Sequence, residues 1–306
     1  MVGRGSAILT KSFLSKTKRL ATLPSMAHSP PTLTKPAHAM LLAAGRGERM
    51  RPLTDTTPKP LLKIQEKPLL WYPLQALAAV GVRHVLINTA WLGEQIPAYF
   101  GEQFVAADKA AVSLSYSHEG RDFGEALETA GGIVRALPQL ADVFWVAAGD
   151  IYAPEFEFSA EAYERFTASP QLAHIWLVPN PAHNPKGDFG LSEGGLALNL
   201  PKSAVMPGPA APNSPAVQAL GHQPVPHAAH SPRYTFSTIA LYKRAFFEAA
   251  WCPIPAGNPE GVKAPLAAML RAAMDQGLVS ASLYEGMWVD VGTPERLAQL
   301  NKTPSA

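Results

Sequence analysis

The chain has 306 residues, of which 47% are hydrophobic and 16% are charged, a composition typical of a soluble globular protein with one large core or two tightly joined lobes. The net charge of +2 does not favour nucleic acid as the main partner. Cys252 is the only cysteine, which excludes a disulfide framework and a thiolate metal cluster and fits a reducing cytoplasm.

The first 39 residues differ from the rest of the chain, because they contain basic residues and no acidic ones. An acid-free segment rich in Ser and Thr is typical of a transit peptide, but also of an unstructured tail. A start codon assigned too far upstream is a third explanation, since Met26 and Met40 follow. We expect residues 1–39 to form a disordered tail and residues 40–300 to form the folded domain.

From His38 onward, short apolar runs alternate with segments of helical periodicity. This alternation predicts an α/β fold of the Rossmann-like, doubly wound kind, with a mostly parallel sheet and helices on both faces. The loops that follow the strands then meet at one edge of the sheet, where ligands bind. The predicted strands are Ala39–Ala44, Val82–Asn88, Val112–Tyr116, Val143–Ala148, Leu172–Val178 and Tyr234–Tyr242. The predicted helices are Leu69–Val80, Trp91–Phe100, Thr129–Leu137 and Ser159–Thr167.

No segment is expected to cross a membrane. The most apolar stretch, Leu69–Val82, contains a proline and a glutamine and ends at Arg83, so it is too short for a spanning helix. The segment Pro201–Pro232 interrupts the alternation, since it is rich in Pro, Ala and His and has no apolar period. It is predicted to be a mobile insertion. Loosely spaced histidines in such a segment more often reflect composition than a metal site; here they are His222, His227 and His230.

The first predicted strand leads into "LLAAGRGERMRPLTDTTPKPLL", residues 41–62. A Walker A loop is excluded because no Gly-Lys-Ser/Thr follows Gly45 at the required spacing. A dinucleotide-binding fingerprint is disfavoured because Met50 stands where its third glycine is needed. The remaining candidate is a glycine turn that lets backbone N–H groups approach a phosphate chain.

Cationic side chains accompany this turn. Arg46, Arg49 and Arg51 offer planar guanidinium groups that match phosphate oxygens. Lys59 lies between two prolines, which hold the backbone in a stiff, non-helical conformation. A lone arginine is usually solvated, and Thr-Pro-Lys-Pro is a common kind of loop, but their joint occurrence behind a first strand favours an anion-binding site.

The motifs "LAAGRGERMRPLT" and "TPKPL" resemble the sugar-1-phosphate nucleotidyltransferases. The resemblance extends through "INTAWLGEQI", "YSHEG", "LETAGGI", "GDIY" and "WVDVGTPERL", and so covers about Met40 to Leu300 without the insertion. Within this family, "INTAWLGEQI", "NPKGDFGLS" and "FSTIALY" are most similar to the branch that acts on N-acetylmuramic acid 1-phosphate.

The resemblance implies transfer of a uridylyl group from UTP to N-acetylmuramic acid 1-phosphate, giving UDP-N-acetylmuramic acid and pyrophosphate in peptidoglycan recycling. A mannose-1-phosphate guanylyltransferase or a glucose-1-phosphate uridylyl- or thymidylyltransferase is the alternative enzyme. A non-catalytic, nucleotide-sugar-binding regulatory subunit is the alternative of another class. Such a subunit would be expected to lose the charged site residues, which this chain keeps.

The resemblance also implies the site residues. Arg49 and Lys59 are the expected catalytic residues, Asp150 and Asp290 the expected Mg²⁺ ligands, and Asp188 a sugar contact in a small β-rich part of the fold. Two departures from the family, Ala148 in place of an asparagine and Ala130 in place of a glycine, leave the base and the sugar open. The expected nucleotide-binding residues are Ala44, Gly45, Arg46, Gly47, Glu48, Arg49, Lys59 and Gly120.

Overall fold

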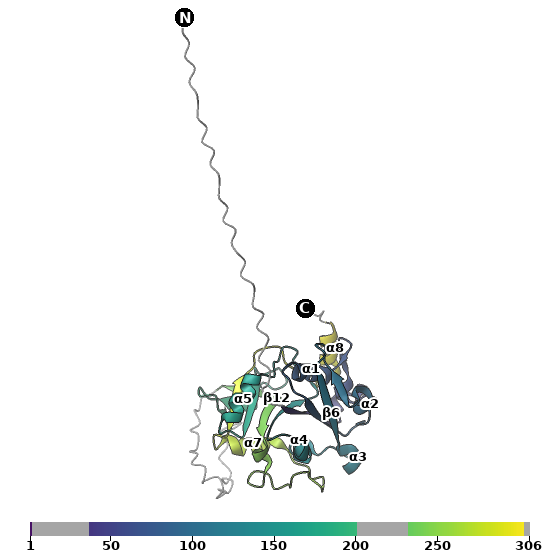
Figure 1. The fold of residues 1–306 in the computed structure, drawn as a ribbon, viewed down its shortest axis with the longest axis vertical. Helices are drawn as coiled ribbons and strands as arrows, with labels where there is room; N and C mark the ends of the chain where they lie inside the picture. Colours follow the sequence, from purple (N-terminus) through teal and green to yellow (C-terminus); the bar gives the residue numbers. More distant parts are fainter. Residues whose placement is uncertain (2–36, 201–231, 303–306) are drawn as a thin grey trace. The chain divides into compact units, whose positions relative to one another are not determined.

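A computed structural model describes residues 37–200 and 232–302, besides Met1 (Figure 1). Residues 2–36 of the predicted tail and residues 201–231 of the predicted insertion, with its three histidines, lie outside the described residues. The first strand, β1 (His38–Ala43), begins two residues before the expected boundary at Met40.

The centre of the fold is one ten-stranded mixed sheet. Its strands are β1, β4 (His84–Thr89), β5 (Gln103–Val105), β6 (Ala111–His118), β7 (Val143–Ala148), β9 (Ala173–Val178), β10 (Phe189–Leu191), β11 (Ala197–Leu198), β12 (Arg233–Lys243) and β13 (Val279–Leu283). Their order is β11-β10-β12-β7-β1-β4-β6-β5, and β9 pairs with both β12 and β13. β1 runs parallel to β4 and β7, and β4 runs parallel to β6, which confirms the predicted parallel centre. β12 runs antiparallel to both β7 and β9, and β5 runs antiparallel to β6.

Helices cover both faces of this sheet, as the alternation predicted (Figure 1). The α-helices are α1 (Trp71–Ala79), α2 (Gln95–Phe100), α3 (Glu119–Phe123), α4 (Glu128–Ala136), α5 (Ala160–Ala168), α7 (Leu266–Met274) and α8 (Pro294–Lys302). α1, α2 and α5 share one hydrophobic core with Leu41 and Trp145 of the sheet. α4 and α7 share the other core with Met40 and Val146. Because neighbouring strand residues point to opposite faces, β1 and β7 contribute to both cores, and all their residues except His38 are apolar.

One predicted helix is shorter than expected. The sequence predicted a helix over Trp91–Phe100, but α2 begins only at Gln95. Leu92 has a φ of 47°, a left-handed conformation that interrupts a right-handed helix. The preceding residues form a turn that places Trp91 beside the loop after β1.

A third, smaller core joins the two ends of the domain. It contains Met50 and Ile64 from the loop after β1 and Val291 and Leu297 from the C-terminal segment. The short elements here are β2 (Lys63–Ile64), β3 (Lys67–Pro68), β8 (Ile151–Tyr152), β14 (Val289–Asp290) and the 3₁₀ turns Glu48–Met50, Leu53–Asp55 and Lys59–Leu61. Two further 3₁₀ turns, Leu137–Gln139 and Arg244–Phe247, lie elsewhere. This core brings residues 45–62 close to Asp290, although more than two hundred residues separate them in sequence.

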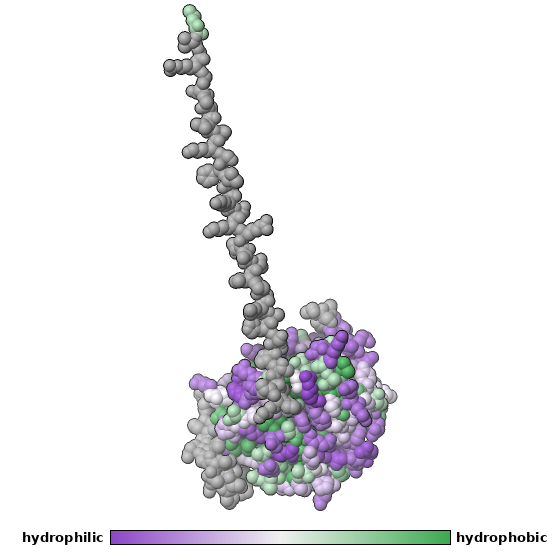
Figure 2. Space-filling model, in the orientation of Figure 1, coloured by the Kyte–Doolittle hydropathy of each residue, from purple (hydrophilic) through white to green (hydrophobic). Residues whose placement is uncertain are grey.

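Hydrophilic residues occupy most of the face drawn in Figure 2, and the hydrophobic patches lie between them. Large apolar side chains at the surface include Tyr99, Val105 and Met287, which belong to separate segments of the chain. None of the described helices is long and apolar enough to cross a membrane.

β12 contains a bulge that places a strained residue at the ligand edge. Between the pairs Phe236–Leu177 and Ala240–Ile175, β12 advances four residues while β9 advances two. Thr238 lies in this bulge with a φ of 65°. A left-handed conformation is unusual for a β-branched residue and costs about 1–3 kcal/mol. The Ser237 hydroxyl donates to the Trp176 carbonyl at 2.7 Å and helps to fix the bulge.

We expect Thr238→Gly to stabilise the domain. Glycine adopts positive φ without strain, and this gain exceeds its backbone entropy cost of about 0.5–1 kcal/mol. The midpoint of thermal unfolding should rise by about 2–4 °C, corresponding to about 1 kcal/mol. As a control, Ser282→Gly in β13, where φ is not positive, should lower the midpoint. A decrease for Thr238→Gly of the same size as the control would contradict the assignment of strain.

Candidate active site

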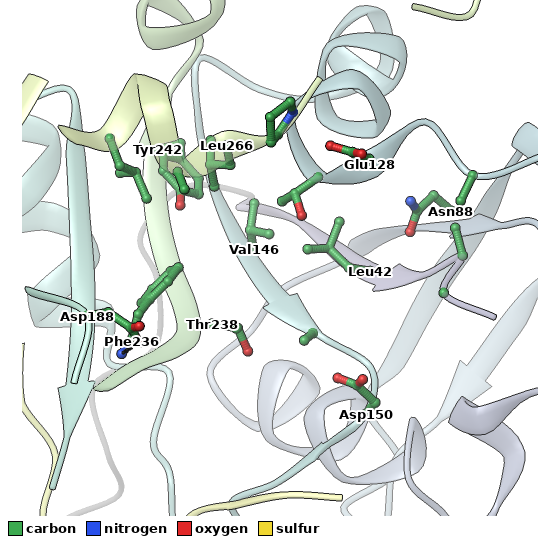
Figure 3. A pocket seen from close by; sticks show the side chains of 18 of the residues that line it. Leu42, Asn88, Glu128, Val146, Asp150, Asp188, Phe236, Thr238, Tyr242 and Leu266 are labelled. Atoms are coloured by element: carbon green, nitrogen blue, oxygen red, sulfur yellow. Dashed lines mark hydrogen bonds between the residues drawn. The ribbon is translucent and has the colours of Figure 1, made fainter. Parts of the chain in front are cut away.

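Two cavities meet at the carboxyl ends of β1 and β7. The larger has a volume of about 750 Å³ and the smaller of about 250 Å³. Leu42, Gly45 and Asp150 line both of them. The side chains labelled in Figure 3 come from the strands β1, β4, β7 and β12, from the starts of α4 and α7, and from two aspartates beside strands, Asp150 and Asp188. The prediction that the strand ends form the ligand edge is therefore consistent with where these cavities lie.

The two glycines of the loop after β1 have different roles. A Cβ added to Gly45 would have no other atom within 4 Å, so this backbone faces open space beside both cavities. Gly47 has a φ of 67°, and a Cβ there would lie 3.1 Å from Thr54 Cγ2 and 3.3 Å from Lys59 Cβ. There is thus free space at the Gly45 backbone, whereas a glycine at position 47 is required by the shape of the loop itself.

Lys59 lies between two carboxylates at the junction of the cavities. Its Nζ is 2.7 Å from Asp150 Oδ2 and 3.7 Å from Asp290 Oδ1, and its side chain is only 8% exposed. The two aspartates meet because β8 and β14 pair directly after β7, with Asp290 opposite Ile151. The Val291 N–H donates to the Asp150 carbonyl at 3.2 Å. The structure thus brings together three residues that the sequence analysis assigned to one site.

Two arginines and a histidine surround Asp290. Its Oδ2 is 3.7 Å from an Arg49 nitrogen, 3.2 Å from Arg296 NH1 and 3.5 Å from His183 Nε2. Burial lowers the pKa of His183, and Arg296 lowers it further, which favours the neutral imidazole at pH 7. The sequence analysis missed His183 and Arg296. Their signal was their place inside the motifs "NPAHNPKGDFG" and "VDVGTPERL".

The two aspartates suit a divalent cation that is completed by a substrate. No group of three or more His, Cys, Asp or Glu residues within residues 37–200 and 232–302 is arranged to hold a metal by itself. Mg²⁺ needs only one or two carboxylates when phosphate oxygens and water supply the remaining ligands. The side chains of Asp150 and Asp290 are 36% and 21% exposed, and Asp150 lines both cavities. This donor set fits Mg²⁺ bound together with phosphates.

Arg46 and Arg51 are engaged in the loop rather than in the cavities. Arg46 donates to the Thr54 carbonyl at 2.9 Å and to Asp55 Oδ1 at 3.0 Å, and its guanidinium stacks 3.7 Å from the centre of the Trp91 ring. Arg51 Nε also lies 2.9 Å from Asp55. Neither arginine lines either of the two cavities described above. Ala44 lines the larger cavity, and Glu48 and Arg49 line the smaller one.

A buried polar chain supports the far side of the larger cavity. The Ala43 N–H donates to Asn88 Oδ1, and Asn88 Nδ2 donates to Glu119 Oε1, both at 2.8 Å. Glu119 Oε2 accepts from the Leu127 N–H at 2.8 Å. The next residue, Gly120, packs so closely that an added Cβ would lie 2.5 Å from the Ala90 carbonyl oxygen. Gly120 thus has a packing role here, and its predicted contact with a nucleobase stays a prediction.

Glu119 should make stability depend on pH. Burial raises the pKa of Glu119 above its usual value of 4.5 and outweighs its hydrogen bonds. The folded state therefore binds a proton at Glu119 more tightly than the unfolded state does. This contribution to the free energy of unfolding is fully present below pH 4.5 and is lost as the pH rises through the pKa of Glu119 in the folded state.

Unfolding by urea, measured from pH 4.5 to pH 8 for the wild type and for Glu119→Gln, checks this expectation. The free energy of unfolding of the wild type should fall relative to that of the variant as the pH rises. Altered hydrogen bonding in the variant adds a constant offset and does not change this slope. Parallel curves would contradict the raised pKa.

Asp188 and Phe236 line the other end of the larger cavity (Figure 3). Asp188 directly precedes β10, and Phe236 belongs to β12. Asp188 Oδ2 accepts from the Phe236 N–H at 3.0 Å and from Asn184 Nδ2 at 3.1 Å. Asp188 lines the cavity as expected of a sugar contact, but this oxygen also holds the local loop in place. Lys263 pairs with Glu125 and does not line this cavity.

Comparison with known proteins agrees with this geometry. A family model described as "Nucleotidyl transferase" matches residues 38–305. The N-acetylmuramate alpha-1-phosphate uridylyltransferase of Neisseria meningitidis serogroup B is 40% identical over 264 residues, which are 85% of this chain and 95% of the relative. A UTP–glucose-1-phosphate uridylyltransferase of Synechocystis is 38% identical over 122 residues, which are 37% of this chain and 30% of the relative.

Among solved structures, a Bacillus anthracis protein described as a glucose-1-phosphate thymidylyltransferase has the same fold, with a TM-score of 0.62. It is 19% identical in sequence, and the match covers 87% of this chain and 94% of that one. The family model covers nearly all described residues, and one relative is similar over most of its length. Both findings indicate the same family as the motifs in the loop after β1. The chain belongs to the nucleotidyl transferase family.

Proposed function

We propose that the protein transfers a uridylyl group from UTP to N-acetylmuramic acid 1-phosphate, giving UDP-N-acetylmuramic acid and pyrophosphate. The identity of 40% over 95% of the Neisseria relative supports this choice of substrates. A reaction of this kind would recycle a component of peptidoglycan in the cytoplasm. The absence of cysteine pairs fits that compartment.

The observation that carries the proposal is the position of Lys59 between Asp150 and Asp290, where the two cavities meet. Two anionic substrates must come together, and their mutual repulsion is the first obstacle to reaction. The Gly45 backbone and the exposed Arg49 guanidinium would bind the nucleotide phosphates in the smaller cavity. The sugar would then occupy the larger cavity with its phosphate directed to the junction.

Charge neutralisation and positioning account for most of the catalysis expected in nucleotidyl transfer. Lys59 would offset the negative charge that develops as the sugar phosphate approaches the α-phosphorus. Asp150 and Asp290 would hold Mg²⁺, which when bound neutralises phosphate oxygens. No general base is needed, because the attacking phosphate oxygen is already ionised at neutral pH.

Assays of pyrophosphate release over a panel of nucleotides and sugar 1-phosphates test the substrates. UTP with N-acetylmuramic acid 1-phosphate should give the highest kcat/KM. Higher activity with GTP and mannose 1-phosphate, or with glucose 1-phosphate, would support the alternative enzymes. Binding of nucleotide sugar without turnover of any pair would support the regulatory subunit.

Lys59→Ala should lower kcat by about two orders of magnitude or more, as is typical for the loss of one electrostatic contact in an active site. Because Lys59 also holds the two aspartates, circular dichroism and the thermal midpoint should be measured on the same preparation. Lys63→Ala is the matched control, since Lys63 is exposed and lies only four residues further along the chain. Near-normal kcat for a folded Lys59→Ala would contradict the role.

A further inference from the structure

The larger cavity has an uneven distribution of charge. Its lining includes four acidic residues, Glu119, Glu128, Asp150 and Asp188. Arg271 of α7 is the one lysine or arginine among the described residues that line it. The rest of the lining is mostly apolar, and a single cation in such surroundings is a strong determinant of which ligand groups bind there.

Arg271 is held in place without an acidic partner. Its NH1 donates to Asn199 Oδ1 at 2.8 Å, and its NH2 lies 3.5 Å from the Asp188 carbonyl oxygen. The guanidinium carbon is 4.9 Å from the centre of the Phe189 ring. Asn199 in turn donates to Asp275 at 3.1 Å. Among the described residues, no carboxylate lies within ion-pair distance of Arg271, so neutral groups orient the guanidinium, and the carboxylates of Asp188 and Asp275 act on it only from further away.

Arg271 lies at the end of the cavity marked by Asp188, whereas Asp150 marks the junction with the phosphate loop. Figure 3 shows these two aspartates on separate parts of the cavity wall, with Thr238 between them. A sugar whose phosphate lies at Asp150 therefore extends toward Asp188 and Arg271. The same end is also close to Arg233, whose NH2 donates to the Asp188 carbonyl at 3.0 Å. Arg271 in the lining and Arg233 behind it together carry more charge than Asp188, the carboxylate that lines this end, so a negatively charged group can bind here.

We propose that Arg271 is a specificity-determining residue that binds the carboxylate of the lactyl ether on the sugar ring. This inference rests on the proposed function, because N-acetylmuramic acid differs from N-acetylglucosamine by that ether alone. A planar guanidinium binds a carboxylate through two parallel hydrogen bonds, which a neutral sugar hydroxyl does not provide. Arg271 thereby favours N-acetylmuramic acid 1-phosphate over the corresponding neutral sugar phosphate.

The test compares kcat/KM for N-acetylmuramic acid 1-phosphate and N-acetylglucosamine 1-phosphate, both with UTP, in the wild type and in Arg271→Gln. Loss of a charge-assisted contact should raise KM for the first sugar phosphate about 10- to 100-fold. KM for UTP and kcat/KM for the neutral sugar phosphate should change less than threefold. The preference for the carboxylate-bearing sugar should therefore collapse.

Arg271→Lys is a second variant, for use if Arg271→Gln does not fold. It keeps the positive charge and should therefore retain part of the preference for the carboxylate-bearing sugar. Arg165→Gln on α5, an exposed arginine paired with Glu161, is the control and should change neither constant. Equal loss of activity toward both sugar phosphates would show that Arg271 only supports the fold and would overturn the inference. An unchanged preference in Arg271→Gln would overturn it as well.

The outcomes also separate this inference from the proposed function. A wild-type enzyme that does not use N-acetylmuramic acid 1-phosphate contradicts the proposed function, and the inference falls with it. A wild-type enzyme that uses this substrate, together with an Arg271→Gln variant of unchanged preference, leaves the proposed function intact and contradicts the inference alone.

Discussion

The sharing of one buried lysine by two carboxylates is the interaction on which the site depends. Lys59 reaches Asp150 and Asp290 because the small core around Met50 and Val291 fixes the loop after β1 against the C-terminal segment. A lysine with 8% exposure requires such partners, since burial of an unpaired charge is costly. The arrangement of these three charged side chains therefore depends on the packing of the small core.

The charged residues of the loop after β1 divide into two sets. Arg46 and Arg51 brace the loop through Asp55, and Arg46 also stacks on Trp91. Arg49, which is exposed, and Lys59, which is buried, remain directed to the smaller cavity. Bracing by the first set keeps the backbone of Gly45 open toward both cavities. The loop is thus braced by two arginines that line neither of the two cavities.

The sequence predicted the parts of the structure that depend on local pattern. β7 has its predicted bounds because a fully buried strand is apolar at every position. The motif residues Lys59, Asp150 and Asp290 also lie together, as predicted from their motifs. The antiparallel direction of β12 and the pairing of β13 with β9 arise from tertiary contacts that no local period records. The contacts of Arg46 with Asp55 and Trp91 arise in the same way from the folded loop, and its predicted contact with a nucleotide stays a prediction. Arg271 could be given a place only once the larger cavity was known.

The most direct test of the account is a crystal structure with UTP and Mn²⁺, because the anomalous signal of manganese locates the metal independently of the protein density. The account predicts a manganese peak within coordination distance of Asp150 and Asp290, with the triphosphate along the backbone at Gly45. A metal bound elsewhere, or a nucleotide outside the two cavities, would contradict it.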